Sequence, residues 1–278
     1  MHSLADTETI PLTDREFAEF QRLIYDLAGI HMTDAKKALI SGRLMKRLRH
    51  YALRSFSAYL AIVTDSANVE ERQTMVNLLT TNETYFFREP KHFDWLRERL
   101  RKRSRAERFR LWSAACSSGQ EVYSLAMVIA DEIGNAPWEI YASDISEKML
   151  TKAVSASYDI EQAEQIPEAY LKRFCLRGIR GAAGSFCIQP ELLQHIHFYR
   201  INLVETLPED FGKFDVIFLR NVMIYFDRDT RRRVTESLLN FLKPEGNLVI
   251  GHAESLLGIT DRLQAVRPTI YMKKNETV

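Results

Sequence analysis

The first eighty residues carry apolar side chains at helical spacing. Thr13 is followed three residues later by Glu16, a pairing typical of a capping box, and apolar residues then recur every three or four positions until Gly29. This pattern predicts a helix that begins after Thr13 and ends before Gly29. The N-terminal region is therefore expected to be all-helical, with further helices starting at Thr33 or Asp34 and over 57–63 and 69–79.

Beyond residue 80 the pattern changes. Short runs rich in β-branched and aromatic residues alternate with helical patterns, which indicates βαβ units and a parallel sheet. Three glycines within 174–188 indicate turns and short antiparallel strands inserted into this α/β region. The expected strands cover 109–114, 139–143, 197–202, 214–220 and 247–251, and 263–273 could close the sheet as an edge hairpin.

Composition narrows the class of protein. The chain of 278 residues is 46% hydrophobic and carries a net charge of +1, so no overall positive field draws it to nucleic acid. Its three cysteines have no metal-ligand or redox-pair spacing, which favours a reducing compartment. No signal-peptide pattern and no run of eighteen apolar residues is present. We therefore expect a cytoplasmic protein that is neither secreted nor inserted into a membrane.

A candidate cofactor site follows the first predicted strand. That strand ends at Ala114, a loop of small residues runs to Gly119, and a helix starts near Glu121. Such a loop places backbone N–H groups at the carboxyl edge of the sheet, where open α/β sheets bind ligands. Because the loop has one glycine rather than three, the pattern disfavours a dinucleotide.

Two carboxylates accompany this loop. Asp144 ends the next strand, where it can accept hydrogen bonds from ribose hydroxyls or simply cap the following helix. Glu121 lies in the first turn of a helix, where the dipole stabilises an acid whatever its function. Together they suit a positively charged adenosyl sulfonium better than NAD. Asn202 and Leu203, after a later strand, could contact adenine, or Asn202 could be a turn residue.

Five sequence strings show a family resemblance. They are LTTNETYFFR at 79–88, SAACSSGQEVYS at 113–124, RNVMIYF at 220–226, LKPEG at 242–246 and GHAES at 251–255. These strings closely resemble the CheR-type chemotaxis receptor methyltransferases, which are protein-glutamate O-methyltransferases. The chain departs from the common pattern at Gln120, where the family often has a second Glu, and at Cys116, where Ala is frequent. Neither change removes a needed charge.

The resemblance implies a three-part fold. A helical receptor-docking domain would cover 1–80, and a linker over 81–92 would contribute to the active site. A Rossmann-like S-adenosylmethionine-dependent methyltransferase domain would cover 93–278, with a small antiparallel β-subdomain inserted at about 174–198. The residues alone give the same division, so the expected fold class is α/β with an all-helical N-terminal domain.

The resemblance also implies the cofactor and its site. The cofactor would be S-adenosyl-L-methionine and the product S-adenosyl-L-homocysteine, with no metal. Arg88 and Tyr225 would face the acceptor, although Arg88 could instead form a surface ion pair and Tyr225 could be a core residue. The cofactor-lining residues would be Asn82, Thr84, Arg88, Glu121, Asp144, Asn202, Leu203, Leu219 and Arg220, with Asn221 beside them.

A basic stretch suggests the partner. Between 35 and 64 there are seven basic residues and no acid, which suits an acidic helical bundle better than an ordinary solvated surface. The resemblance implies contact with the cytoplasmic helical domain of methyl-accepting chemotaxis receptors, and we expect a monomer. The residues expected to dock this receptor are Lys36, Lys37, Arg43, Lys46, Arg47 and Arg49.

Two other functions fit parts of the sequence. A nucleic-acid methyltransferase would also combine basic patches with this fold, but the proline-containing motif of base-amino methylation is missing from 220–226. A binding module without catalysis is the second alternative, and the intact set of Arg88, Glu121, Asp144 and Tyr225 argues against it. His252 is expected to be a hydrogen-bonded histidine at a strand end.

Overall fold

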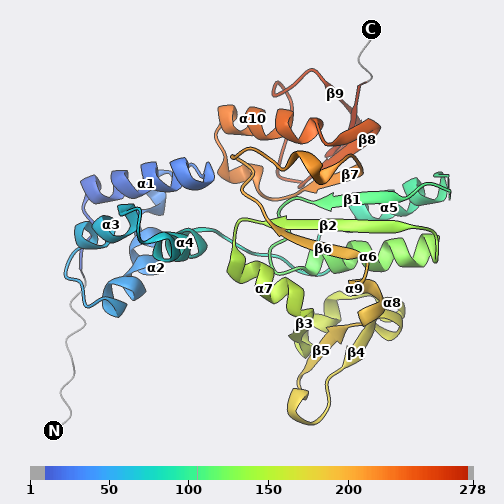
Figure 1. Ribbon diagram of the computed structural model, residues 1–278, viewed down its shortest axis with the longest axis horizontal. Helices are drawn as coiled ribbons and strands as arrows, with labels where there is room; N and C mark the ends of the chain where they lie inside the picture. The colour runs from blue at the N-terminus through green and yellow to red at the C-terminus, as the bar shows by residue number, and fades with distance from the viewer. Residues whose placement is uncertain (1–9, 105, 275–278) are drawn as a thin grey trace. The chain divides into compact units, whose positions relative to one another are not determined.

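A computed structural model describes residues 10–104 and 106–274 of the chain. They form two compact units, and the division between these units falls between Thr81 and Asn82. The first unit contains helices, and the second combines strands and helices (Figure 1). The α/β fold class expected from the sequence is confirmed. Within the described residues, no helix combines the length and apolar character needed to cross a membrane.

Over its described residues, 10–81, the N-terminal unit consists of four α-helices and one 3-10 turn. Thr13 and Glu16 exchange the two hydrogen bonds of a capping box, as predicted, and the Thr13 N–H donates to the Glu16 carboxylate at 2.9 Å. Gly29 ends the first helix with φ 68°, a left-handed conformation open to glycine. The elements are α1 Asp14–Ala28, η1 Asp34–Lys36, α2 Lys37–His50, α3 Phe56–Thr64 and α4 Val69–Leu79.

Glu71 on α4 is a buried carboxylate that joins three helices. It accepts hydrogen bonds from Arg47 Nε of α2 at 2.8 Å and from the Tyr59 hydroxyl of α3 at 2.6 Å. The Tyr51 hydroxyl donates to its other oxygen at 3.0 Å. Burial alone would raise the pKa of Glu71, but the hydrogen bonds from Arg47 and the two tyrosines outweigh burial and hold that pKa below its usual value.

We expect Glu71→Gln to lower the free energy of unfolding by about 2–3 kcal/mol at neutral pH, because Arg47 loses its buried counter-charge. Since folding depresses the pKa of Glu71, its stabilisation is present above the unfolded value of 4.5 and is lost as the pH falls through the folded value. Urea unfolding at neutral and acidic pH should show the difference between wild type and variant shrinking in acid. Glu70→Gln, at an exposed neighbour, is the control; an equal loss in that variant would contradict the assignment.

The second unit contains a seven-stranded sheet in the order β6-β2-β1-β7-β8-β10-β9. The first five strands in this order are parallel, and β10 and β9 form an antiparallel hairpin at the edge, as expected over 263–273. Their bounds are β1 Phe109–Ser113, β2 Trp138–Asp144, β6 Ile196–Arg200, β7 Phe214–Leu219, β8 Leu242–Ile250, β9 Leu263–Arg267 and β10 Ile270–Lys273.

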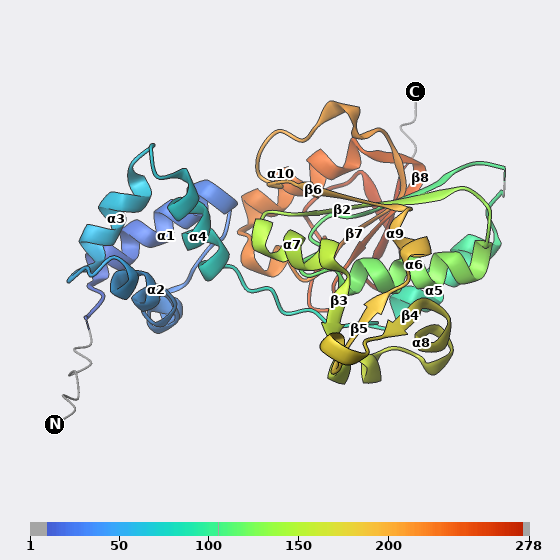
Figure 2. The same ribbon diagram turned by 60° about the horizontal axis from the view of Figure 1, so that its bottom comes forward.

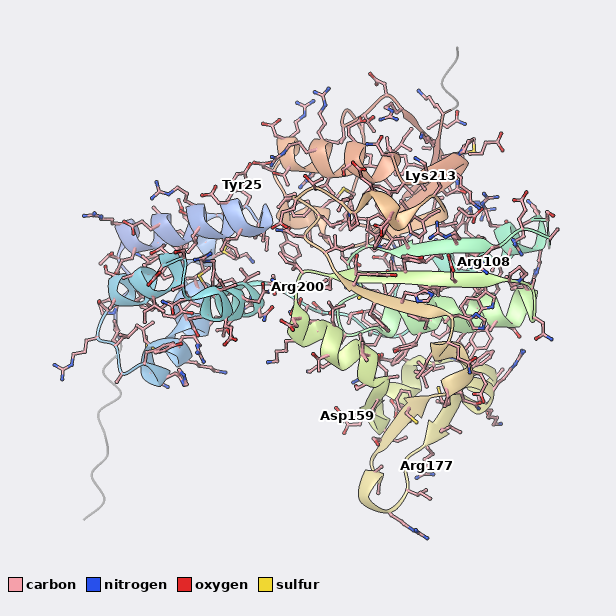
Figure 3. All side chains as sticks on the ribbon, in the orientation of Figure 1. Tyr25, Arg108, Asp159, Arg177, Arg200 and Lys213 are labelled. Atoms are coloured by element: carbon pink, nitrogen blue, oxygen red, sulfur yellow. The ribbon has the colours of Figure 1, made fainter. Side chains whose placement is uncertain are left out.

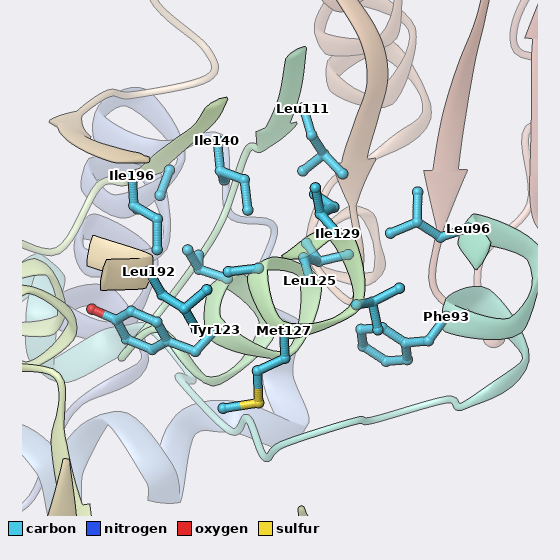
Figure 4. Close-up of a cluster of buried hydrophobic side chains, with 14 of the residues drawn as sticks. Phe93, Leu96, Leu111, Tyr123, Leu125, Met127, Ile129, Ile140, Leu192 and Ile196 are labelled. Carbon is cyan, nitrogen blue, oxygen red and sulfur yellow. The ribbon is translucent and has the colours of Figure 1, made fainter. Parts of the chain in front are cut away.

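Helices cover both faces of this sheet. Side chains alternate along β1, so that Leu111 packs in the core beside α5 and α6, and Trp112 packs in the core beside α10. Figure 4 shows Leu111, Ile140 and Ile196 of three strands pointing toward α6. The sheet is therefore the middle of three layers, and the helices of this unit are α5 Lys91–Arg101, α6 Gln120–Ile133, α7 Glu147–Ser155, α8 Glu168–Phe174, α9 Pro190–Leu193 and α10 Arg228–Leu239.

A separate three-stranded antiparallel sheet, in the order β3-β5-β4, is visible in Figures 1 and 2. It consists of β3 Ser157–Asp159, β4 Cys175–Arg177 and β5 Ser185–Ile188. The expected insertion at about 174–198 thus holds two of the three strands, but the sheet begins upstream at β3, and residues 196–198 belong to β6. A strand of three residues is too short to show alternation in the sequence.

The strand order reverses at β1, which pairs with β2 on one side and with β7 on the other. Ligands of open α/β sheets bind outside the carboxyl ends of the strands at such a point. Figure 3 shows the two ends of the sheet, with Arg108 just before β1 at one end and Arg200 at the end of β6 at the other. The carboxyl ends of the parallel strands share the Arg200 end.

Candidate active site

The loop between β1 and α6 is held against the end of β2. The Cys116 N–H donates to the Ser143 carbonyl at 2.8 Å, and the Ser117 N–H donates to the Asp144 carboxylate at 2.8 Å. Gly119 has φ 95° and directly precedes α6. Burial raises the pKa of the Cys116 thiol well above its usual value, so this residue stays a neutral thiol in a tight loop. The loop lies where the sequence predicted it.

We expect Gly119→Ala to lower the free energy of unfolding by about 2 kcal/mol. A Cβ at this position would lie 2.8 Å from the Tyr158 hydroxyl, which donates to the Ser118 carbonyl at 2.7 Å and would lose that bond by moving. Urea unfolding measures the effect. Gly258→Ala is the control, because Gly258 has φ 69° but the nearest described atom to a Cβ there, Nη2 of Arg228, would lie 3.8 Å away. Equal losses would show that backbone strain, not crowding, makes Gly119 necessary.

Asp144 is buried at the end of β2, with 7% of its surface exposed. One carboxylate oxygen accepts from Ser117, and the other accepts from the Ser146 N–H at 2.8 Å. Burial raises the pKa of Asp144, and these backbone hydrogen bonds partly oppose the rise. Ser146 is the N-cap of α7, so capping that helix does not account for the carboxylate. Asp144 instead connects β2 to the β1–α6 loop.

Glu121, Arg220 and Glu89 form a buried chain of charges. Arg220 Nη1 donates to Glu121 at 3.0 Å, and Arg220 Nη2 lies 3.1 Å from Glu89. The Arg220 side chain is 2% exposed and each glutamate side chain 12%. Burial raises the pKa of Glu121 against the opposing effect of Arg220, whereas in Glu89 the effect of burial is outweighed, mainly by Arg220, and the pKa falls. Two carboxylates share one guanidinium, and this excess of acidic groups over basic groups favours a cationic ligand.

The segment 82–88 is attached to the α/β unit. The Phe86 N–H donates to Gln165 at 3.0 Å, and the Phe87 N–H donates to the Ser124 hydroxyl oxygen at 3.0 Å. The Ser117 hydroxyl donates to the carbonyl of Asn82 at 3.1 Å. Asn82 therefore lies at the β1–α6 loop, and the partly exposed Thr84 lies between these anchoring contacts in the sequence.

Arg88 and Tyr225 are both partly exposed. The Arg88 guanidinium donates to the Glu83 carbonyl at 2.9 Å and lies 5.6 Å from the centre of the Tyr85 ring. No ion pair of Arg88 with a described residue is present, although its main-chain carbonyl accepts from Arg220. Tyr225 ends the short turn η5 Met223–Tyr225, and it is more exposed than the buried Phe226 that follows it.

Asn221 is fixed by two glutamates that sequence reasoning missed. With φ 58°, it donates its N–H to Glu254 at 2.9 Å and its side-chain amide to Glu89 at 3.2 Å. Glu254 also accepts the Gly251 N–H at 2.6 Å, and a Cβ on Gly251 would lie 2.5 Å from the Asn221 amide nitrogen. The sequence did contain a signal for Glu254, because this residue lies in the string at 251–255 and follows the apolar strand β8.

The remaining cofactor candidates lie at strand ends. Leu219 is completely buried at the end of β7, next to Arg220. Asn202 donates to Glu205 at 2.8 Å and accepts from the Val204 N–H at 3.4 Å, which is the turn role considered for it. Leu203 packs against the core beside α10.

Comparisons with known proteins identify the family. A family model described as the CheR methyltransferase all-alpha domain matches residues 15–80, and one described as the CheR methyltransferase SAM binding domain matches residues 82–272. The chain belongs to the CheR methyltransferase family. The chemotaxis protein methyltransferase of Escherichia coli is 39% identical, over 95% of this chain and 93% of that protein. The Salmonella typhimurium protein of that name is 38% identical, over 95% and 92%, and chemotaxis protein methyltransferase 2 of Pseudomonas aeruginosa is 38% identical, over 93% of each.

This CheR-family protein is an S-adenosylmethionine-dependent methyltransferase of chemotaxis, as predicted. Its residues fit that cofactor. Asp144 offers a carboxylate that suits a pair of ribose hydroxyls, and Glu121 offers one that suits an ammonium group. The β1–α6 loop has no phosphate-binding glycine pattern. The donor set therefore matches a cationic nucleoside and not a dinucleotide.

The six basic residues expected to bind a receptor divide into two groups. Lys37 pairs with Asp14 at 2.5 Å, and Arg43 donates to carbonyls at the end of α4 at 3.0 Å. Arg47 is bound to Glu71. These three residues are bound within the helical unit by acids and carbonyl groups of other helices. Those partners lie outside residues 35–64, so the charge count over that stretch missed them. Lys36, Lys46 and Arg49 are exposed and form no ion pair with a described residue.

Proposed function

We propose that this CheR-family protein methylates glutamate side chains in the cytoplasmic helical domain of methyl-accepting chemotaxis receptors. The products are glutamyl methyl esters and S-adenosyl-L-homocysteine. The observation that carries the proposal is the partly exposed Arg88 guanidinium, at the end of a segment anchored to the β1–α6 loop. The protein acts as a cytoplasmic monomer, without inserting into membranes and without binding nucleic acid.

The cofactor supplies a methyl group on a positively charged sulfur. Asp144 would accept hydrogen bonds from the ribose hydroxyls, and Glu121, held by Ser113 at 2.7 Å and by Arg220, would hold the amino group. Asn202 and Leu203 would lie against the adenine. Asn82, Thr84, Arg88, Leu219, Arg220 and Asn221 complete the lining.

The chain's own residues act on the acceptor by position. A glutamate is ionised at neutral pH and needs no general base, so catalysis comes from alignment and exclusion of water. Arg88 offers a planar fork that can hold a carboxylate through two parallel hydrogen bonds. Tyr225 would place an aromatic ring or hydroxyl beside the positive sulfur and would favour the charged donor.

A methylation assay tests this function. The purified chain is incubated with methyl-labelled S-adenosylmethionine and receptor-containing membranes, and alkali-labile label on the receptor is measured. We expect labelled esters that disappear when the receptor's methyl-accepting glutamates are changed to alanine. Alkali-stable label on RNA would favour a nucleic-acid methyltransferase, and cofactor binding without transfer to receptor would favour a binding module.

The exposed basic residues of α2 give a separate prediction. We expect the double variant Lys46→Glu, Arg49→Glu to lower kcat/KM for receptor methylation about tenfold, with the loss shrinking at high salt, because charge complementarity mainly raises the association rate. The Kd for S-adenosylhomocysteine should not change. Arg22→Glu, at an exposed position of α1, is the matched control. Equal losses of kcat/KM in the double variant and in the control would show that the net charge of the protein matters, and not this face of α2.

A further inference from the structure

A cluster of metal-ligating side chains lies beside Arg220. Glu89 precedes α5, His92 lies in the first turn of α5, and His252 follows β8. One carboxylate oxygen of Glu89 and one ring nitrogen from each histidine lie within 4.8 Å of one another. Neither histidine has a part in the methyl transfer proposed above.

Thr269 fixes the tautomer of His92. The Nε2 of His92 lies 2.8 Å from the Thr269 hydroxyl oxygen, and the proton of that hydroxyl is donated to the Pro268 carbonyl at 2.6 Å. The hydroxyl oxygen therefore accepts from Nε2–H, which leaves the ring's lone pair on Nδ1. Metal-binding histidines are oriented in this way, with the second ring N–H held by a neighbouring oxygen.

The free Nδ1 of His92 is buried and has no hydrogen-bond partner among the residues that the structure describes. The His92 side chain is 2% exposed, and Nδ1 faces the Oε2 atom of Glu89 at 3.4 Å. A lone pair thus faces a carboxylate oxygen with no proton between them. A cation would give Nδ1 a partner and add to those of Oε2, which already lies 3.1 Å from Arg220 Nη2 and accepts the His252 N–H at 3.2 Å. The separation of Nδ1 and Oε2 matches that of two ligands bound tetrahedrally at about 2.0–2.1 Å.

His252 supplies the third donor atom, and its exposure to solvent would let an ion reach the site. Its Nε2 lies 4.0 Å from the same Glu89 oxygen, and 48% of its side chain is exposed to solvent. The surrounding charge also favours a cation, because two carboxylates face the single guanidinium of Arg220. These carboxylates belong to Glu89 and Glu121.

We propose that Glu89, His92 and His252 bind a divalent transition-metal ion of the zinc type. Two imidazoles and one carboxylate are a donor set that Zn²⁺ takes, with water in the fourth position. The ion ties the start of α5 to the loop that follows β8. It takes no part in methyl transfer, so the proposal stands independently of the acceptor.

Metal titration of the full chain, after removal of metal by a chelator, tests the site. We expect one Zn²⁺ per chain with a Kd on the order of 1 μM by calorimetry, and Co²⁺ should give the intense visible absorption of a four-coordinate ion. His252→Ala should weaken Zn²⁺ binding at least about tenfold and remove the cobalt spectrum. His31→Ala, at an exposed histidine of the N-terminal unit, should change neither.

Thr269→Gly supplies a second variant, which replaces none of the three proposed ligands. It removes the hydroxyl that orients His92, and glycine tolerates the φ of 63° at this position. We expect it to weaken Zn²⁺ binding about tenfold. Absence of one-to-one binding, or an unchanged cobalt spectrum in His252→Ala, would overturn the proposal. So would nitrogen NMR showing a protonated His92 Nδ1 at neutral pH in the metal-free chain, since that proton would bind Glu89 instead.

Discussion

Asp144→Asn is expected to weaken the binding of S-adenosylhomocysteine about 100-fold. Hydrogen bonds to a charged group contribute about 1.5–3 kcal/mol each, and the substitution removes the charge that two ribose hydroxyls would share. A loss of about 2.7 kcal/mol corresponds to that factor. Asparagine keeps the shape and one acceptor oxygen, so the bond from the Ser117 N–H at 2.8 Å can persist.

Calorimetric titration of wild type and variant measures this effect. Glu147→Gln, at an exposed acid in the first turn of α7, is the matched control and should bind like wild type. Circular dichroism and urea unfolding should show that the variant remains folded. If Asp144→Asn binds as tightly as wild type, the proposed ribose contact is wrong, and the carboxylate serves only to hold the β1–α6 loop.

Local features of the fold could be predicted from the sequence because their causes are local. The capping box of Thr13 and Glu16 and the left-handed Gly29 each depend on a few neighbouring residues, and so do the apolar runs that mark the longer strands. The three-residue strand β3 was missed, because its place in a sheet depends on pairing with β5, a distant segment. The alternation of apolar positions carries no signal over so short a strand.

The site was only partly predictable for the same reason. The sequence indicated Glu121, Asp144 and Arg220, but the hydrogen bond between Arg220 and the main chain of Arg88 spans 132 residues. Glu89 belongs to the same network, and no local pattern distinguishes it from a surface acid. In the basic stretch, by contrast, the sequence suggested a free charge where the structure has an ion pair. Arg47 is paired with Glu71, which lies on another helix.

Arg88→Ala is expected to lower kcat/KM for receptor methylation about 100-fold, because a substrate carboxylate that is no longer aligned seldom reaches the reactive geometry. The Kd for S-adenosylhomocysteine should rise no more than a few-fold. The reason is structural: Arg220 is held by the main-chain carbonyl of Arg88, and that carbonyl remains in the alanine variant. Removing the side chain therefore leaves the chain of charges through Glu121 and Glu89 intact.

Arg88→Lys separates charge from geometry. Lysine keeps the positive charge but lacks the planar fork, so we expect an intermediate loss of about tenfold in kcat/KM. A lysine variant as active as wild type would show that charge alone suffices. A fully active Arg88→Ala protein would remove Arg88 from the mechanism, whereas a large rise in the Kd for S-adenosylhomocysteine would assign it to the cofactor and not to the acceptor. Steady-state kinetics with receptor membranes, combined with calorimetry on the same preparations, distinguishes these outcomes.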